Sequence, residues 1–406
     1  MSEETVGKRV SWVELYFDLI FVFAVGQTTH IMEVDPRWSG FGRALGLFVP
    51  LWWAWVGFVV LYNRHGEDRA AQRLFVLAGT LPCAVAAVET HAAAGGHGTV
   101  FVLALAGVRL VLALAFAHTG GQARWVAGGY GLSTVAFAGS AFVPGPARIT
   151  LWVFALLQEA GVLLLRDAGR TRQRAGERPR RGRVEALRAM LRPPADPARR
   201  VDAAHLAERF GLMMIILLGE VVVAVAGSAV DADAGHDARY WLGLLAGLVL
   251  AAALWWIYFT ASAPINESVL RASGGNPSLA YGLYAGGHLS PAFALLTMAA
   301  GVSLVLSGEA PTAAVWFVTG GLAAYLQGTR SLVTNRSLRV GPPLRAAVIA
   351  ATVCLALLRP LISTTGVVLA TAAWAVALAG YVTWRTPGRL RDVAADPLAY
   401  FRSAAS

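Results

Sequence analysis

The sequence predicts an all-α fold, a polytopic integral membrane protein of about 12 transmembrane helices in two six-helix pseudo-repeats. Of the 406 residues, 56% are hydrophobic and only 14% are charged, whereas a soluble domain is typically about 25% charged. Apolar runs long enough to cross a bilayer recur along the whole chain. Basic residues collect in alternate connecting segments, as expected of a chain that crosses a membrane many times.

Twelve apolar runs of spanning length define the expected helices. They lie near residues 11–32, 42–62, 71–90, 99–118, 123–143, 148–165, 205–229, 240–262, 279–307, 311–329, 344–361 and 364–384. Turn and charge signals separate the runs, for example at residues 63–66 and 341–343. Each run is therefore expected to form one helix that crosses the bilayer.

Three sequence marks recur in the same order in two parts of the chain. The first run begins with Glu14-Leu-Tyr-Phe and the seventh with the similar Glu208-Arg-Phe-Gly. The second and eighth runs each contain a tryptophan pair, Trp52-Trp53 and Trp255-Trp256. The third and ninth runs each contain a proline, Pro82 and Pro291. Tryptophan pairs and prolines are also common in unrelated membrane helices, so the repeat is an interpretation of their order. Two six-span repeats would share one orientation, a layout known among transporters.

This repeat gives the expected organisation of the chain. Residues 1–166 form an N-terminal six-helix half, 167–203 a basic cytoplasmic linker, 204–386 a C-terminal six-helix half, and 387–406 a cytoplasmic tail. Residues 166–200 hold twelve arginines and four acidic residues, which is most of the net charge of +10. A basic loop of this kind is typical of the cytoplasmic side and can touch anionic lipid, so a nucleic-acid partner is not expected.

Two carboxylates lie inside the first run. Glu14 and Asp18 are four residues apart, which places them on one face of a helix. Arg109 lies near the middle of the fourth run, and Glu220 lies about two-thirds of the way across the seventh. Charges at such depth must face protein or water and commonly mark an ion path or a relay. These residues are therefore candidates for an ion or solute pathway.

Arg109 is too deep to reach an interface, so it is expected to pair with a carboxylate across the bundle. Asp18 and Glu220 both lie within about 10 Å of its depth by the helical rise. Asp18 is the favoured partner, because consecutive spans pack together more often than distant ones.

Three further candidates have structural alternatives. Glu208 and Arg209 lie about one turn into the seventh run, where they could form a plain interfacial ion pair. His288 precedes Pro291, and the proline is expected to kink the ninth helix within the membrane. A histidine beside a kink suits a gate or a relay, although a histidine that only packs between helices is the commoner case.

No enzyme signature is present in the sequence. It contains no P-loop, no Gly-x-Ser-x-Gly, no His-Glu-x-x-His and no Cys-x-x-Cys. Its two cysteines, Cys83 and Cys354, both lie in apolar runs. The chain is therefore expected not to be an enzyme, to have no catalytic residues, and to bind no cofactor or metal.

Two segments resemble a known family. Residues 12–30, from Trp12 to His30, and residues 205–220, from His205 to Glu220, are similar to the two signatures of the bacterial low temperature requirement protein A (LtrA) family. In that family a small hydroxyl residue often follows the Gly-Glu pair, whereas this chain has Val221. The resemblance implies a bacterial inner-membrane protein linked to growth at low temperature.

Two functions from different classes are consistent with these observations. The first is a transporter or channel for a small ion or a proton-coupled solute, which uses a charged site between the halves. The second is a non-transporting membrane sensor or scaffold whose buried charges only lock helices together. The expected partners are the bilayer, anionic lipid at the basic linker, the small ion or solute and, as one possibility, a second copy of the chain in a homodimer. Both termini are expected to be cytoplasmic.

Overall fold

The structure is a computed structural model of the chain. It describes residues 10–66, 69–121, 123–175, 191–194, 196, 199–227, 237–308, 311–329 and 341–396. All regular secondary structure in these ranges is helical, and no strand occurs in them. The central part of the predicted basic linker, residues 176–190, lies outside the described residues, as do residues 228–236.

The helices before residue 176 are here called the N-terminal half. They are α1 (Trp12–Val34), α2 (Trp38–His65), α3 (Ala70–Val88), the short α4 (Thr90–Ala94), α5 (Thr99–Thr119), α6 (Ala123–Ser140) and α7 (Gly145–Ala175). Each of the first six predicted runs overlaps one of the longer helices in this half. The helix α7 continues past residue 166, where the basic linker was expected to begin.

The helices after residue 190 are called the C-terminal half. They are α9 (Ala203–Gly227), α10 (Ala238–Ile257), η2 (Tyr258–Ser262), α11 (Ala263–Ala272), α12 (Pro277–Ala280), η3 (Tyr281–Gly286), α13 (Leu289–Leu306), α14 (Thr312–Thr329), α15 (Gly341–Cys354), η4 (Leu355–Leu358) and α16 (Thr364–Ala395). The segments η2 and η3 are π-helical. The helix α16 continues past residue 386 to Ala395, so part of the predicted tail is helical.

The ninth predicted run, at 279–307, lies in the helical segment Pro277–Leu306. The regular α-helix is interrupted just before Pro291: the π-helix η3 ends at Gly286, residues 287–288 form a turn, and α13 begins at Leu289. A proline disturbs a helix at the carbonyl four residues before it, which here belongs to Gly287. The interruption therefore lies where Pro291 was expected to kink the helix.

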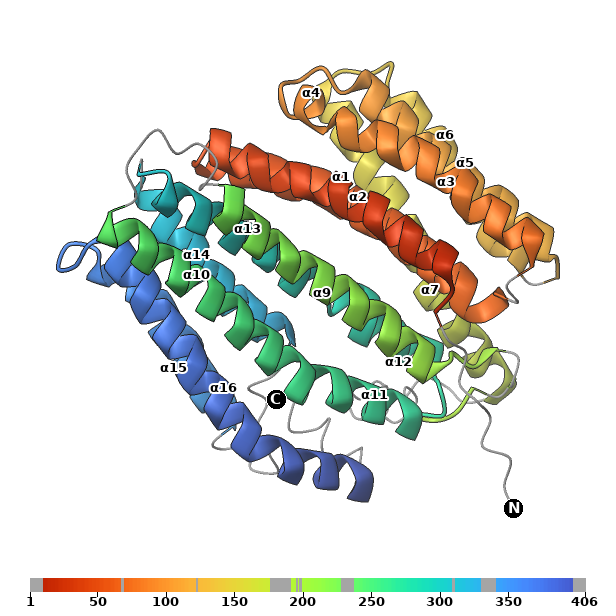
Figure 1. The fold of residues 1–406 in the computed structure, drawn as a ribbon. Helices are drawn as coiled ribbons and strands as arrows, with labels where there is room; N and C mark the ends of the chain where they lie inside the picture. The colour runs from red at the N-terminus through yellow and green to blue at the C-terminus, as the bar shows by residue number, and fades with distance from the viewer. Residues whose placement is uncertain are drawn as a thin grey trace.

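The long helices lie side by side in a row of layers (Figure 1). Helices α3, α5 and α6 form one end of the row, and α15 and α16 form the other. The middle of the row is the contact between the halves, where α1 packs against α9 and α13, and α2 packs against the same two helices. Segments nearly 200 residues apart in the chain therefore meet at the centre of the molecule.

The outward faces of the outer helices are apolar. In α3, exposed Leu74, Leu77, Leu81 and Val85 repeat at intervals of three and four residues, which forms one stripe on a helix. Among the described residues, seven helical segments are long and apolar enough to cross a membrane: Trp12–Val34, Trp38–His65, Ala70–Val88, Thr99–Thr119, Ala238–Ala272, Pro277–Leu306 and Thr364–Ala395. Exposed apolar side chains of this kind are favourable in contact with the hydrocarbon of a bilayer, so the fold is that of a helical membrane protein.

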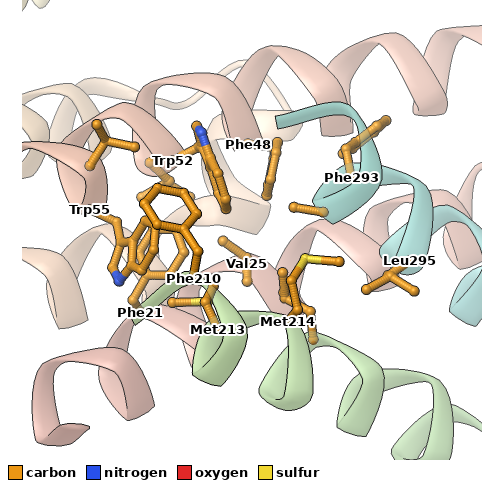
Figure 2. Packing of buried hydrophobic residues seen from close by; sticks show 14 of the residues in the cluster. Phe21, Val25, Phe48, Trp52, Trp55, Phe210, Met213, Met214, Phe293 and Leu295 are labelled. Carbon is orange, nitrogen blue, oxygen red and sulfur yellow. The ribbon is translucent and has the colours of Figure 1, made fainter. Parts of the chain in front are cut away.

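The contact between the halves is filled by large buried side chains (Figure 2). Phe21 of α1, Phe48, Trp52 and Trp55 of α2, Phe210 of α9 and Phe293 of α13 belong to one cluster. The ring centroids of Trp55 and Phe210 lie 4.8 Å apart, and those of Phe48 and Phe293 lie 5.2 Å apart. Aromatic contacts at these distances stabilise the packing beyond the effect of buried area alone. We call this set the aromatic cluster.

A pair of glycines in α14 allows a test of the packing. A Cβ atom at Gly321 would lie 2.5 Å from Met298 Cγ of α13, whereas one at Gly320 would meet nothing within 4 Å. Gly321→Ala is therefore expected to lower the free energy of unfolding by about 1–3 kcal/mol through overpacking. Gly320→Ala, the matched control, should leave it unchanged or raise it by up to about 1 kcal/mol through helix propensity. Thermal melts in detergent would measure both, and equal melts would contradict this packing.

Candidate functional site

An acidic face of α1 points at the C-terminal half. Glu14 and Asp18 are both almost completely buried, as their depth predicted. Glu14 lies in the first turn of α1, where Oε2 accepts hydrogen bonds from the backbone N–H of Ser11 at 3.0 Å and from its hydroxyl at 2.9 Å. This is a capping arrangement, and it ties Glu14 to the positive end of the helix dipole.

A basic face of α9 meets those carboxylates. His205 and Arg209 are four residues apart, so they too share one face of a helix. Arg209 Nη2 donates to Asp18 Oδ1 at 2.7 Å, and Arg209 Nε lies 3.5 Å from Glu14 Oε1. His205 Nε2 lies 3.4 Å from the same Glu14 oxygen. Two acidic and two basic positions at matched spacing thus face each other across the halves, and we call these four residues the inter-half cluster.

The helix α2 supplies neutral partners on either side of the inter-half cluster. Trp55 Nε1 donates to Asp18 Oδ1 at 2.8 Å, and the Trp55 ring also lies under the Arg209 guanidinium, 5.9 Å from its carbon. Asn63 contacts His205 Nδ1 at 3.2 Å. Because Trp55 also belongs to the aromatic cluster, the buried charges lie directly beside buried aromatic side chains.

Some polar atoms of the inter-half cluster are not satisfied by the described residues. Glu14 Oε1 and Asp18 Oδ2 accept no hydrogen bond in this part of the chain, and Arg209 Nη1 donates none. Buried polar groups in folded proteins are nearly always hydrogen-bonded. Among the described residues, no group of three His, Cys, Asp or Glu side chains is arranged to hold a metal ion.

Arg109 pairs with a carboxylate, as predicted, but the expected partner was wrong. Arg109 Nε lies 3.2 Å from Glu159 Oε1 of α7, and both side chains are fully buried. The guanidinium also donates to the Pro50 carbonyl of α2 at 2.8 Å and lies over the Phe137 ring at 4.5 Å. Asp18 is not available to it, because the acidic face of α1 points toward α9.

The predicted interfacial pair between Glu208 and Arg209 is also wrong. Glu208 is exposed, while Arg209 is buried and bonded to Asp18 and Glu14. Adjacent residues on a helix point in directions about 100° apart, so one faces the protein and the other faces outward. Glu208 does not join the inter-half cluster.

Glu220 lies near the opposite end of the contact between α1 and α9. Its carboxylate packs against Gly26 of α1, where a Cβ atom would lie 3.1 Å from Glu220 Oε1. The structure therefore places Glu220 on the same helix pair as the inter-half cluster, but on the far side of the aromatic cluster.

His288 joins the two π-helical segments. Its Nε2 contacts the Tyr258 hydroxyl of η2 at 2.8 Å, and its Nδ1 contacts the Leu283 carbonyl of η3 at 3.0 Å. A carbonyl can only accept, so Nδ1 carries a proton, whereas the Tyr258 hydroxyl can either donate to Nε2 or accept from it. The ring also stacks on Tyr284 at a centroid distance of 5.4 Å. These contacts hold the His288 ring in place beside the aromatic cluster.

Four residues that contact the buried charges were not among the predicted site residues. Glu159, His205, Trp55 and Asn63 each bond to a buried charge or to another member of the site. The spacing of His205 and Arg209 repeats the spacing of Glu14 and Asp18, and this signal could have identified the histidine. Nothing in the local sequence distinguishes Trp55 or Asn63 from ordinary helix residues.

Comparisons with known proteins agree with the two sequence signatures. A family model described as bacterial low temperature requirement A protein (LtrA) matches residues 9–380, which include the whole inter-half cluster. A curated protein of Rhizobium meliloti (strain 1021), described as uncharacterized, is 24% identical over 266 residues, or 64% of this chain. The chain spans about 60% of the length of that relative. No solved structure matches the chain.

Proposed function

The chain belongs to the bacterial low temperature requirement A (LtrA) family, and on that premise we propose that it is a transporter or channel. It moves a small ion or a proton-coupled solute through the charged site between its halves. The proposed location is the bacterial inner membrane, and the proposed role is linked to growth at low temperature, in line with the description of the family. The distribution of the basic residues supports cytoplasmic positions for both termini.

One observation carries the proposal. Asp18 is fully buried at the contact between the halves, holds Arg209 and Trp55 on one oxygen, and leaves its second oxygen without a described partner. Ionisable groups in a membrane interior are costly and are retained where they serve a pathway. A site shared by two halves can also change when one half moves against the other.

The proposed architecture is 12 transmembrane helices in two six-helix repeats. Helix contacts support it for the first four spans of each half. In the N-terminal half α1 packs on α2 and α3, and α3 packs on α5; in the C-terminal half α9 packs on α10 and α13, and α13 packs on α14. The last spans differ, because α7 packs on α6 whereas α16 packs mainly on α10.

Asp18→Asn is expected to give a folded protein that no longer transports. Asparagine keeps an oxygen that can accept the hydrogen bonds from Trp55 and Arg209, but it carries no negative charge. The protein should therefore still fold, while the site should no longer bind the transported ion. Reconstituted vesicles with a pH-sensitive dye and a panel of ions and solutes would measure this. The matched control is Glu208→Gln, an exposed carboxylate one residue from Arg209, which should transport like the wild type. Equal transport by Asp18→Asn would refute the assigned role.

A non-transporting sensor or scaffold is the second candidate. The Arg109–Glu159 pair favours it, because this pair lies wholly within the N-terminal half and is fully buried. A double variant separates the two functions. If the inter-half cluster only locks helices, Asp18→Leu with Arg209→Leu should fold well and support growth in the cold, since a buried pair can be replaced by apolar residues. If the site transports, the same double variant should fold and remain inactive.

A further inference from the structure

The amide of Asn63 is held in one orientation by the residue that begins α9. Asn63 Nδ2 donates to the Asp202 carbonyl at 2.9 Å, and Asn63 Oδ1 accepts from the Asp202 backbone N–H at 3.2 Å. A carbonyl only accepts and an N–H only donates, so the two ends of the amide cannot be exchanged. Asp202 is itself fixed as the N-cap of α9, where its Oδ1 accepts from the backbone N–H groups of Ala204 and His205.

This orientation fixes the proton of His205. The Asn63 atom that faces His205 Nδ1, at 3.2 Å, is the donor Nδ2. Nδ1 must therefore be an unprotonated acceptor, and the single ring proton must sit on Nε2, which faces Glu14. A second proton on Nδ1 would set two donors against each other in a fully buried place. The orientation of the Asn63 amide therefore opposes a second proton on the His205 ring.

The inter-half cluster then has more negative than positive groups. The charged and titratable groups that act on Asp18 are Arg209 and Glu14, and those that act on Glu14 are His205 and Arg209. With His205 neutral, two carboxylates share one guanidinium. Burial makes an unmatched charge expensive, so one of the carboxylates requires a proton or another single positive charge.

The hydrogen bonds distinguish the two carboxylates. Glu14 Oε2 accepts from the N–H and hydroxyl of Ser11 at the positive end of α1, and these donors favour the ionised form. Asp18 lies a turn further in, and both of its bonds, from Trp55 and Arg209, go to Oδ1. Glu14 Oε1 and Asp18 Oδ2 are both buried and accept no hydrogen bond from the described residues. Glu14 Oε1, however, lies 3.4 Å from His205 Nε2 and 3.5 Å from Arg209 Nε, so a proton added there would face nitrogen groups that can donate. A proton added to Asp18 Oδ2 displaces no existing hydrogen bond.

We propose that Asp18 is the proton-binding group of this protein, with the proton carried on Oδ2 and with Asn63 holding His205 Nδ1 as an acceptor. The inference rests on the proposed transport function and names its ion. One O–H bond forms at Asp18 Oδ2 and one O–H bond of a hydronium ion at the N-terminal end of α1 breaks, which leaves water. A bare alkali cation fits less well, because a metal ion seeks several oxygen ligands, whereas the cluster has only two oxygens that accept no hydrogen bond from the described residues, and one of them, Glu14 Oε1, lies 3.5 Å from Arg209 Nε.

Infrared difference spectra between neutral and acidic buffer test the proposal on the full chain in lipid nanodiscs. The wild type should gain a carboxylic-acid carbonyl band that Asp18→Asn lacks and that Glu208→Gln keeps. A band unaffected by Asp18→Asn would overturn the proposal. So would loss of the band when sodium or potassium chloride replaces choline chloride, since an alkali cation would then be the ligand. Proton binding is read without transport, so a wild type that binds the proton but moves nothing in vesicles would refute the transport function alone.

A second variant tests the role of Asn63. Asn63→Leu removes the donor that faces His205 Nδ1, so the imidazole should become able to accept a proton. Imidazolium ring bands are expected to appear in this variant at acidic pH, and the Asp18 band should weaken. Imidazolium bands from His205 already present in the wild type would overturn the assignment. Absence of these bands in a folded Asn63→Leu protein would do so as well.

Discussion

Arg209→Ala is expected to lower the free energy of unfolding by about 3–5 kcal/mol, the usual effect of breaking a buried ion pair. The substitution leaves Glu14 and Asp18 buried without their shared guanidinium. It also removes side-chain atoms that pack on the Trp55 ring at the contact between the halves. Because α1 and α9 come from different halves, the loss should also weaken the contact between the halves.

Denaturation of the detergent-solubilised protein, followed by tryptophan fluorescence, would measure this effect. Arg239→Ala is the matched control, because Arg239 is exposed on α10 and its removal should change stability by less than about 0.5 kcal/mol. Arg209→Met combined with Asp18→Leu should recover part of the lost stability, since Asp18 is then no longer a buried carboxylate without its cation, while Glu14 keeps its hydrogen bonds from Ser11. A single Arg209→Ala variant as stable as the wild type would show that the carboxylates do not depend on this arginine.

Arg109→Ala is expected to have a comparable effect, about 3–5 kcal/mol, but confined to the N-terminal half. The change leaves the fully buried Glu159 carboxylate without its cation and frees the Pro50 carbonyl. Arg109→Lys should not restore stability, because one ammonium group cannot reach the carboxylate and the carbonyl while also stacking on Phe137. The planar guanidinium meets all three at once.

The controls for this pair lie on neighbouring helices. Arg124→Ala, at an exposed position of α6, should leave the thermal melt unchanged. The double variant Arg109→Leu with Glu159→Leu should melt near the wild type and keep any transport activity, because the pair holds helices of one half together. Loss of transport in a well-folded double variant would instead assign the pair to the pathway.

The sequence by itself determined that the chain is helical, that it has several apolar segments long enough to cross a membrane, and that Asp18 and Arg109 are buried. These properties follow from the solvent. Hydrocarbon accepts only helices with satisfied backbones, and it forces Asp18 and Arg109 to face protein. The family also followed from sequence alone, because the signatures at 12–30 and 205–220 are continuous stretches of the chain.

The tertiary structure alone decided which charges meet. Residue spacing gives the depth of a side chain along its helix, but more than one carboxylate lies near the depth of Arg109. Arg109 pairs with Glu159 and not with Asp18 because of the faces that the packed helices turn toward each other. The same rotation separated the exposed Glu208 from the buried Arg209. The tertiary structure also determines the π-helical turns that His288 joins. These turns depend on contacts from other helices, such as the hydrogen bond from Trp52 Nε1 to the Ala285 carbonyl.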